Sequence, residues 1–331
     1  MTCKILQGDS REIIKGLADR GVNCIVTSPP YFGLRDYGHE AQIGIEQSPD
    51  EYVGQMVEVF RECRRVLRDD GTLWLNLGDS YATQGGSGRQ GQTGQRATRR
   101  FTAEIASSKG VPDGLKSKDL IGIPWRVALA LQTDGWYLRQ DIIWHKPNPM
   151  PESVTDRCTK AHEYIFLLSK SERYYFDYAA IKERTAYPHD KRRPLGSKGA
   201  WQIDGRQQGE NGGGRSYDHD TAMRNKRSVW TVTTTPFKGA HFATFPPDLI
   251  QPCILAGCPR GGEILDPFGG AGTTGMVAER DLRNSILIEL PHGTRPDQSR
   301  RWEGGMRFAG VEARFGAAVR RCSGMRGRTR K

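Results

Sequence analysis

Two short strings of residues, far apart in the chain, combine polar groups with a constrained backbone. The first is Ser28-Pro29-Pro30-Tyr31, which follows the apolar run 22–26. The second is 266–274, which reads Asp-Pro-Phe-Gly-Gly-Ala-Gly-Thr-Thr and follows the apolar residues 264–265. Open α/β sheets bind ligands beyond the carboxyl ends of their strands, so both strings are candidates for a functional site.

The first string offers hydrogen-bond acceptors and an aromatic ring. The Ser28 hydroxyl and the Pro29 carbonyl can both accept hydrogen bonds. Pro29 and Pro30 restrict the backbone, which predicts that these oxygens point into a cleft. The ring of Tyr31 offers a flat face for stacking. Taken alone, the string is typical of an ordinary proline turn after a strand.

The second string reads as strand, glycine turn and helix, an arrangement that lets the backbone approach a ligand closely. Glu289 closes the next apolar strand, 285–288, roughly twenty residues after the turn. That spacing suits a carboxylate that accepts hydrogen bonds from ribose hydroxyls. A surface acid at a strand end is the alternative interpretation of Glu289.

Together the strings resemble the signatures of the DNA amino-methyltransferases, which methylate exocyclic base nitrogens with S-adenosylmethionine. That family's catalytic signature is Asp/Asn/Ser-Pro-Pro-Tyr/Phe, and its cofactor signature, Phe-x-Gly-x-Gly, is matched by Phe268, Gly270 and Gly272. The catalytic string comes first, as in the circularly permuted beta group. The resemblance covers residues 4–290. It implies an α/β, Rossmann-like methyltransferase fold with a mostly parallel sheet flanked by helices, and S-adenosyl-L-methionine as cofactor.

The resemblance also implies roles for individual residues. Asp9, in a Gly-Asp pair near the start, contributes to the adenine pocket, and Asp266 meets the ammonium group of the cofactor directly or through water. The segment 144–149 resembles the lining of the target-base pocket, with its prolines exposing Trp144 and Asn148, although Trp144 by itself would be a core residue. The implied site comprises catalytic Ser28, Pro29, Pro30 and Tyr31; cofactor-binding Asp9, Asp266, Phe268, Gly270, Gly272 and Glu289; and base-pocket Trp144 and Asn148.

Hydrophobic periodicity predicts the elements that position these groups. A strand and turn at 4–9, a helix capped by Ser10 and the apolar strand make a parallel βαβ start. Residues 48–51 form a capping box that opens an amphipathic helix ended by Gly71, with a buried strand at 72–77. A helix at 120–131 and strands at 141–144 and 163–168 extend the sheet to five or more strands.

The chain divides by composition into four parts. Residues 1–183 form the catalytic half, with a mobile loop at 83–117, and residues 236–290 form the cofactor-binding half. Residues 184–235, where basic and aromatic residues interleave, match the position of the family's target-recognition region, although a solvated disordered insert has the same composition. The tail 291–331 departs from the family pattern, and is either a basic arm or the product of an altered reading frame.

Bulk properties narrow the class of protein. The net charge of +11 fits nucleic-acid binding weakly, because the tail 291–331 alone carries eleven basic and three acidic side chains, a net +8. Without a long apolar run or a signal segment, the chain is expected to be cytoplasmic. A bacterial or phage-encoded, DNA-associated protein is the expectation that goes with the resemblance. The seven cysteines form no Cys-x-x-Cys pair, so no metal site is expected.

Serine at the first catalytic position favours methylation of cytosine N4, with adenine N6 as the alternative by the same mechanism. An RNA or protein methyltransferase and a noncatalytic DNA-binding protein are the remaining alternatives. Duplex DNA is the expected partner. A homodimer and a separately acting restriction endonuclease of the same specificity are further candidate partners, and no membrane association is expected.

Overall fold

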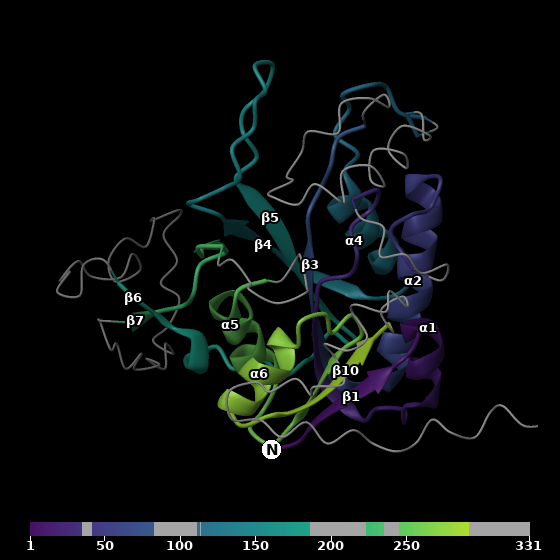
Figure 1. Cartoon of the computed structure of the whole chain (residues 1–331). Helices are drawn as coiled ribbons and strands as arrows, with labels where there is room; N and C mark the ends of the chain where they lie inside the picture. The colour runs from purple at the N-terminus through teal and green to yellow at the C-terminus, as the bar shows by residue number, and fades with distance from the viewer. Residues whose placement is uncertain (35–41, 83–110, 113, 186–222, 235–244, 291–331) are drawn as a thin grey trace, which may run out of the picture. The chain divides into compact units, whose positions relative to one another are not determined.

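The computed structural model describes residues 1–34, 42–82, 111–112, 114–185, 223–234 and 245–290 (Figure 1). The chain divides into two compact units, one of residues 178–227 and the other of the remaining chain. Most of the predicted loop 83–117, most of the insert 184–235 and the whole tail 291–331 lie outside the described residues.

The larger unit is built on a mostly parallel sheet. In the described part of the chain it has eight strands in the order β1-β10-β9-β2-β3-β5-β4-β8, and only β5 runs antiparallel to its neighbours. The carboxyl ends of the other strands therefore share one edge with the amino end of β5. The strands are β1 (Cys3–Gln7), β2 (Val22–Thr27), β3 (Leu67–Leu77), β4 (Tyr137–His145), β5 (His162–Ser169), β8 (Val229–Thr231), β9 (Glu263–Asp266) and β10 (Asn284–Glu289).

Helices cover both faces of this sheet (Figure 1). One layer holds α1 (Ser10–Ile13), the 3₁₀ turn η1 (Ile14–Gly16), α2 (Pro49–Val66) and α4 (Ile123–Thr133), and the other holds α5 (Pro247–Gly257) and α6 (Thr273–Arg280). Side chains of β3 point alternately to the two layers. Leu73 and Leu75 join the core with α2. Thr72 lies against the other layer, because a Cβ added to Gly257 of α5 would lie 2.6 Å from its hydroxyl oxygen. The predicted α/β class and flanking helices are confirmed.

Helix α2 follows its sequence signals closely. The Ser48 hydroxyl accepts a hydrogen bond from the Glu51 amide at 3.2 Å, and Pro49 is the first helical residue. The Glu51 carboxylate reaches back to the amide of Gln47 at 3.0 Å, one residue before the cap. The apolar stripe of the helix is fully buried, as its spacing predicts: Tyr52, Met56, Val59, Phe60 and Cys63.

Two predicted boundaries are wrong. The helix ends at Val66, not at Gly71, because Leu67 is already extended and pairs with Val22 of β2. Gly71 instead lies inside β3 at an irregular register, where an added Cβ would lie 2.5 Å from Leu67 Cγ. At the chain start the cap of α1 is Asp9, whose carboxylate accepts from the amide of Arg11 at 2.9 Å, and Ser10 is the first helical residue.

The smaller unit, 178–227, contains the 3₁₀ turn η2 (Ala179–Ile181) and a two-stranded antiparallel sheet of β6 (Glu183–Arg184) and β7 (Met223–Arg224). Within it the Glu183 carboxylate pairs with Arg224 at 2.8 Å and with Arg227 at 2.5 Å. Strand β8 falls inside the range 184–235 expected for the insert, yet it pairs with β4 in the main sheet. Residues 229–231 therefore belong to the larger unit.

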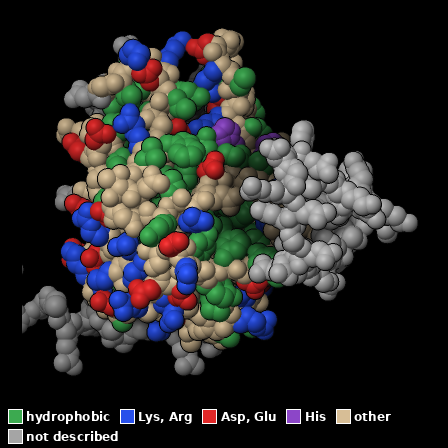
Figure 2. Space-filling model, turned by 180° about the vertical axis from the view of Figure 1, so that it is seen from behind, with side chains coloured by type: hydrophobic (Ala, Val, Ile, Leu, Met, Phe, Trp, Pro, Cys, Tyr) green, Lys and Arg blue, Asp and Glu red, His purple; other side chains and the backbone are tan. Residues whose placement is uncertain are grey.

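The described surface carries charges of both signs. On the face shown in Figure 2, Lys and Arg side chains are interspersed with Asp and Glu rather than gathered in one patch. Much of the basic excess counted in the sequence belongs to the tail 291–331, outside the described residues. Each helix that the structure describes is too short or too polar to cross a bilayer.

Candidate active site

The two strings lie beside each other at one edge of the sheet. Strand β2, which leads into Ser28, pairs in parallel with β9, which leads into the second string. At the ends of these strands the Thr27 hydroxyl donates a hydrogen bond to the Asp266 carboxylate at 2.6 Å. Residues separated by most of the chain are thus joined where both strings begin.

Asp266 is buried, with 1% of its surface exposed. Besides Thr27, it accepts hydrogen bonds from the Thr274 hydroxyl at 2.6 Å and from the Phe268 amide at 3.1 Å. Burial raises the pKa of this carboxyl to about 6, although the three donors act in the opposite direction. The carboxylate faces inward and holds the glycine turn in place, and its contact with a ligand ammonium stays a prediction.

The glycine turn between β9 and α6 is fastened to β10. Gly272 has a φ of 79°, a left-handed conformation that favours glycine, and it is the residue before α6. The amide of Gly270 donates to the Glu289 carboxylate at 2.7 Å. Burial raises the pKa of Glu289 to about 7, partly offset by that hydrogen bond. Glu289 therefore supports the turn, and its bond to a ribose stays a prediction.

Asp9 follows β1 and belongs to the same edge. Its carboxylate pairs with the Arg11 guanidinium at 2.6 Å, and both side chains are about a quarter exposed. The hydroxyl of the neighbouring Ser10 donates to the Pro267 carbonyl, which ties the end of β1 to the second string. The adenine-pocket role of Asp9 stays a prediction.

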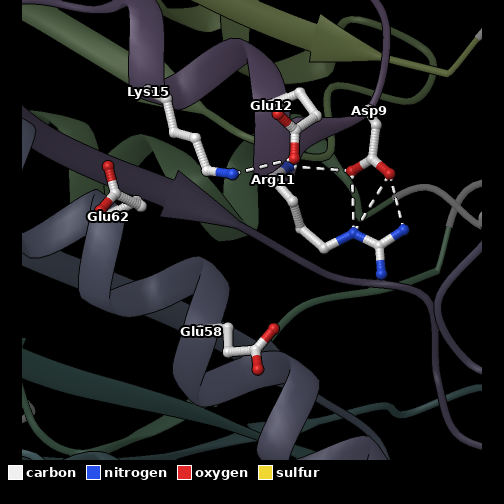
Figure 3. Close-up of a pocket in the computed structure, with 6 residues that line it drawn as sticks. All are labelled: Asp9, Arg11, Glu12, Lys15, Glu58 and Glu62. Atoms are coloured by element: carbon white, nitrogen blue, oxygen red, sulfur yellow. Dashed lines mark hydrogen bonds and ion pairs between the residues drawn. The ribbon is translucent and has the colours of Figure 1, made fainter.

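A polar pocket opens beside Asp9, between α1 and α2 (Figure 3). Figure 3 shows Arg11 turned toward Asp9 and Lys15 toward Glu12, with an Nζ–Oε1 distance of 2.9 Å in the second pair. Acidic side chains from α2 complete the lining, which consists of Asp9, Arg11, Glu12, Lys15, Glu58 and Glu62. The two cations, Arg11 of α1 and Lys15 of η1, are thus each paired with an acid close by in the chain.

The first string is held rigidly on its core side. Pro29 is buried, whereas Ser28, Pro30 and Tyr31 are partly exposed. The Tyr52 hydroxyl of α2 donates to the Pro30 carbonyl at 2.8 Å. Because burial raises the pKa of Tyr52, this phenol keeps the proton that it donates. The backbone turn at Pro29 and Pro30 is therefore anchored to the helix layer.

The Tyr31 hydroxyl enters a polar cluster that sequence reasoning missed. It donates to Glu163 Oε2 at 2.8 Å and lies 3.4 Å from both Ser28 Oγ and Asn76 Oδ1. Burial, and then the nearby Glu163 carboxylate, raise the pKa of this phenol. Tyr31 therefore stays protonated and its hydroxyl is a donor.

Glu163 reaches this cluster because β5 is antiparallel. Its position at the amino end of β5 brings it to the edge where the other strands end, between Asn76 on β3 and Lys146 just after β4. Lys146 forms an ion pair with Glu163 Oε1, and the Asn76 amide donates to Oε2 at 3.2 Å. An acid at the start of a predicted strand was the available signal, but it required knowing the strand direction.

Gly78 gives the Tyr31 ring its place. It directly follows β3, and a Cβ built there would lie 2.5 Å from Tyr31 Cε2 and 3.1 Å from Cδ2. Any side chain at position 78 would therefore displace the ring. Sequence reasoning did not single out this glycine.

The two predicted base-pocket residues differ in exposure. The expectation that prolines expose Trp144 is wrong: its side chain is 4% exposed, and its indole N–H donates to the Val232 carbonyl at 2.8 Å. Pairing of β4 with β8 covers the ring. Asn148 is exposed, and exchanges hydrogen bonds of 3.2 and 3.1 Å with the backbone of Thr234. Whether either residue lines a base pocket stays a prediction.

The groups collected at this edge suit a ligand that carries hydroxyls and a positive charge. Partly exposed carboxylates stand at the ends of the neighbouring strands β1 and β10, and the glycine turn with the half-buried Phe268 follows β9, the next strand after β10. Ser28 and Tyr31 lie on the neighbouring strand end. The carboxylate acceptors thus fit S-adenosyl-L-methionine, whose ribose hydroxyls and ammonium group are donors and whose sulfonium carries a positive charge.

A family model described as DNA methylase matches residues 22–294 of the chain. The chain belongs to the DNA methylase family. Its chemistry is methyl transfer and its substrate class is DNA. The order of the two strings and the parallel sheet agree with the beta group expected from the sequence.

Individual relatives agree with this family. The Type II methyltransferase M.SmaI of Serratia marcescens is 46% identical over 289 residues, which cover 87% of each chain. The solved PvuII DNA methyltransferase, which is cytosine-N4-specific, is 18% identical with a TM-score of 0.58, covering 88% of this chain and 83% of its own. A Thermus thermophilus chain solved as a complex with S-adenosyl-L-methionine is 21% identical, with a TM-score of 0.50 and coverages of 88% and 90%. At these identities, what the two structures show of this chain is its fold.

Proposed function

We propose that this DNA methylase transfers a methyl group from S-adenosyl-L-methionine to the exocyclic N4 of cytosine in duplex DNA. The target base is flipped out of the helix and stacked at residues 28–31, the base-side string. Residues 266–274, the cofactor-side string, hold the methyl donor. The proposal depends on the hydrogen bond of 2.6 Å between Thr27 and Asp266, because it brings the two strings together.

The base-side string supplies hydrogen-bond acceptors for the exocyclic amine, which is the nucleophile. The lone pair of an exocyclic amine is delocalised into the ring, so a site that accepts hydrogen bonds from its N–H groups makes the nitrogen more nucleophilic. The Ser28 hydroxyl and the Pro29 carbonyl are the acceptors, and the Tyr52 hydroxyl anchors the next carbonyl, that of Pro30. The Tyr31 ring, held against Gly78, stacks on the base.

The cofactor-side string and its neighbours hold the donor. When bound, S-adenosyl-L-methionine supplies a methyl group activated on a positively charged sulfur. Its binding residues are the set predicted above, with Glu289 accepting from ribose hydroxyls, Asp9 beside the adenine and Asp266 at the methionine end. Because both strings are fixed at the same edge, nitrogen and methyl group can be aligned without a covalent intermediate on the protein. The complexed Thermus thermophilus structure supports this cofactor.

Two observations favour cytosine over adenine. Serine stands at the first position of the catalytic signature, where aspartate is commoner in adenine N6 enzymes of the family. The PvuII enzyme, whose fold this chain shares, is cytosine-N4-specific. Adenine N6 methylation by the same mechanism is the second candidate.

Sequence recognition belongs to residues 184–235, a range that overlaps the compact unit 178–227. Its basic and aromatic composition suits phosphate contact and base stacking. The exposed Asn148 is proposed to border the base pocket, and the buried Trp144 to support its wall. A separately acting endonuclease of the same specificity is the proposed partner, because relatives such as M.SmaI are Type II methyltransferases.

The test is methylation of unmethylated genomic DNA with methyl-labelled S-adenosyl-L-methionine, run in parallel with RNA and protein. The DNA is then digested to nucleosides, and we expect labelled N4-methylcytosine by mass spectrometry. N6-methyladenine would overturn the cytosine assignment. Label in RNA or protein with none in DNA would overturn the proposal as a whole. Tyr31→Ala serves as the low-activity control.

A further inference from the structure

We infer that Glu163 is a positioning residue for this methyl transfer, terminating a hydrogen-bond chain from Ser28 through Tyr31 that keeps the Ser28 hydroxyl in its accepting orientation. The inference rests on the proposed function. It deepens that function by giving a role to a residue of β5, which lies outside both strings.

The chain has a defined direction. A carboxylate only accepts hydrogen bonds, so the Tyr31 hydroxyl must donate to Glu163 Oε2, at 2.8 Å. The Tyr31 oxygen is then available as an acceptor, and the Ser28 hydroxyl donates to it over a longer distance of 3.4 Å. The direction of both hydroxyl protons is thus set from the Glu163 end.

This direction matters for the base. A serine hydroxyl has one proton and two lone pairs. When its proton points toward Tyr31, the lone pairs of Ser28 can accept from the amine N–H of the target. If the proton were free to point at the base, two donors would face each other and the amine would lose an acceptor.

The carboxylate of Glu163 is held on both oxygens. Lys146 forms an ion pair with Oε1, and the Asn76 amide donates to Oε2 at 3.2 Å and to the Tyr164 carbonyl at 3.1 Å. The Glu163 side chain is only 16% exposed. These contacts, from β3 and from the residue after β4, prevent it from turning away from Tyr31.

A purely structural ion pair is the competing explanation, and the chain offers a matched control for it. Glu152 pairs with Arg157 at 2.6 Å, and its side chain is 18% exposed, close to the value for Glu163. Its ion pair involves neither Ser28 nor Tyr31. Replacing either glutamate by glutamine removes one charge from a comparably buried pair, but only E163Q disturbs the hydroxyl chain.

The experiment compares wild type, E163Q, Y31F, the double variant and E152Q in steady-state methylation of genomic DNA. We expect E163Q to lower kcat about tenfold, because the glutamine amide presents a donor either to Tyr31 or to Lys146. KM for DNA and the calorimetric affinity for S-adenosyl-L-methionine should stay within about twofold. In the Y31F background E163Q should have no further effect, and E152Q should keep the wild-type kcat.

Equal kcat for E163Q and wild type, or effects of E163Q and Y31F that multiply, would overturn the inference. Y31F covers the case in which E163Q does not fold, because it interrupts the same chain and leaves the Glu163–Lys146 pair intact; an unchanged kcat for Y31F overturns the inference as well. Failure of the proposed function looks different, since the wild-type protein would then transfer no methyl group to DNA.

Discussion

The cofactor side and the base side of the site are built in different ways. On the cofactor side, the supporting contacts of the glycine turn are mostly local: Asp266 binds Phe268 and Thr274, and Gly270 binds Glu289, all within 19 residues. On the base side, Tyr31 depends on Asn76 and Glu163, which lie 45 and 132 residues away. A local motif thus specifies the first side, whereas the second requires the assembled sheet.

The largest expected effect tests the side-chain hydrogen bond between Thr27 and Asp266, which joins the ends of the two paired strands. Asp266→Ala leaves two buried hydroxyls and an amide without their acceptor, and each such loss costs about 1–3 kcal/mol. We expect the free energy of unfolding in urea to fall by about 4 kcal/mol, with weaker cofactor binding by calorimetry. The exposed Asp248 provides the control, since Asp248→Ala should change neither quantity. If Asp266→Ala bound the cofactor as tightly as the wild type, this carboxylate would have no role in cofactor binding.

The next effect is confined to the base side. Tyr31→Ala removes a stacking surface worth about 1–3 kcal/mol, so kcat should fall about a hundredfold. Calorimetric cofactor affinity should stay nearly unchanged, because the hydrogen bonds of Tyr31 run to Ser28, Asn76 and Glu163 rather than to the glycine turn. Tyr137→Ala, at an aromatic residue of β4 that is 45% exposed, is the matched control. Unchanged turnover in Tyr31→Ala would remove the stacking role.

This contrast explains what the sequence could and could not predict. The strand, glycine turn and helix of the cofactor side depend on neighbours in the chain, and their elements were predicted nearly to the residue. The direction of β5 has no local signal, so the arrival of Glu163 beside Tyr31 could not be predicted. Trp144 shows the same limit, because its burial depends on β8, more than eighty residues further along.

The cofactor side also has a pH dependence that can be tested. Burial raises the pKa of Glu289 from 4.5 to about 7, so between these values the folded protein binds more protons than the unfolded chain. Its contribution to stability is therefore complete below pH 4.5 and is lost as the pH rises through 7. Glu289→Gln places a side chain that cannot ionise at this position. Between about pH 5 and 7.5, the free energy of unfolding of this variant should therefore fall by about 2 kcal/mol less than that of the wild type.

Urea unfolding at both pH values measures this difference. Asp266, whose pKa is raised to about 6, gives a slope of the same sign and remains in the Glu289→Gln variant, so the slope should shrink without vanishing. Glu263→Gln is a second variant of a partly buried acid whose pKa burial raises, and it lies at the opposite end of the strands. An identical slope in wild type and Glu289→Gln would show that this carboxyl ionises normally in the folded protein.

The smallest effect sharpens the base side alone. Gly78→Ala places a Cβ 2.5 Å from Tyr31 Cε2, so the ring must shift by several tenths of an ångström while the hydroxyl chain stays attached. We expect kcat to fall about fivefold, or about 1 kcal/mol in the barrier, with cofactor affinity unchanged. Gly54→Ala is the control, because a Cβ at this helical glycine meets nothing within 4 Å. If both alanine variants kept the wild-type kcat, stacking on the target base would not depend on where Gly78 holds the ring, and the base side would tolerate more movement than its long-range contacts imply.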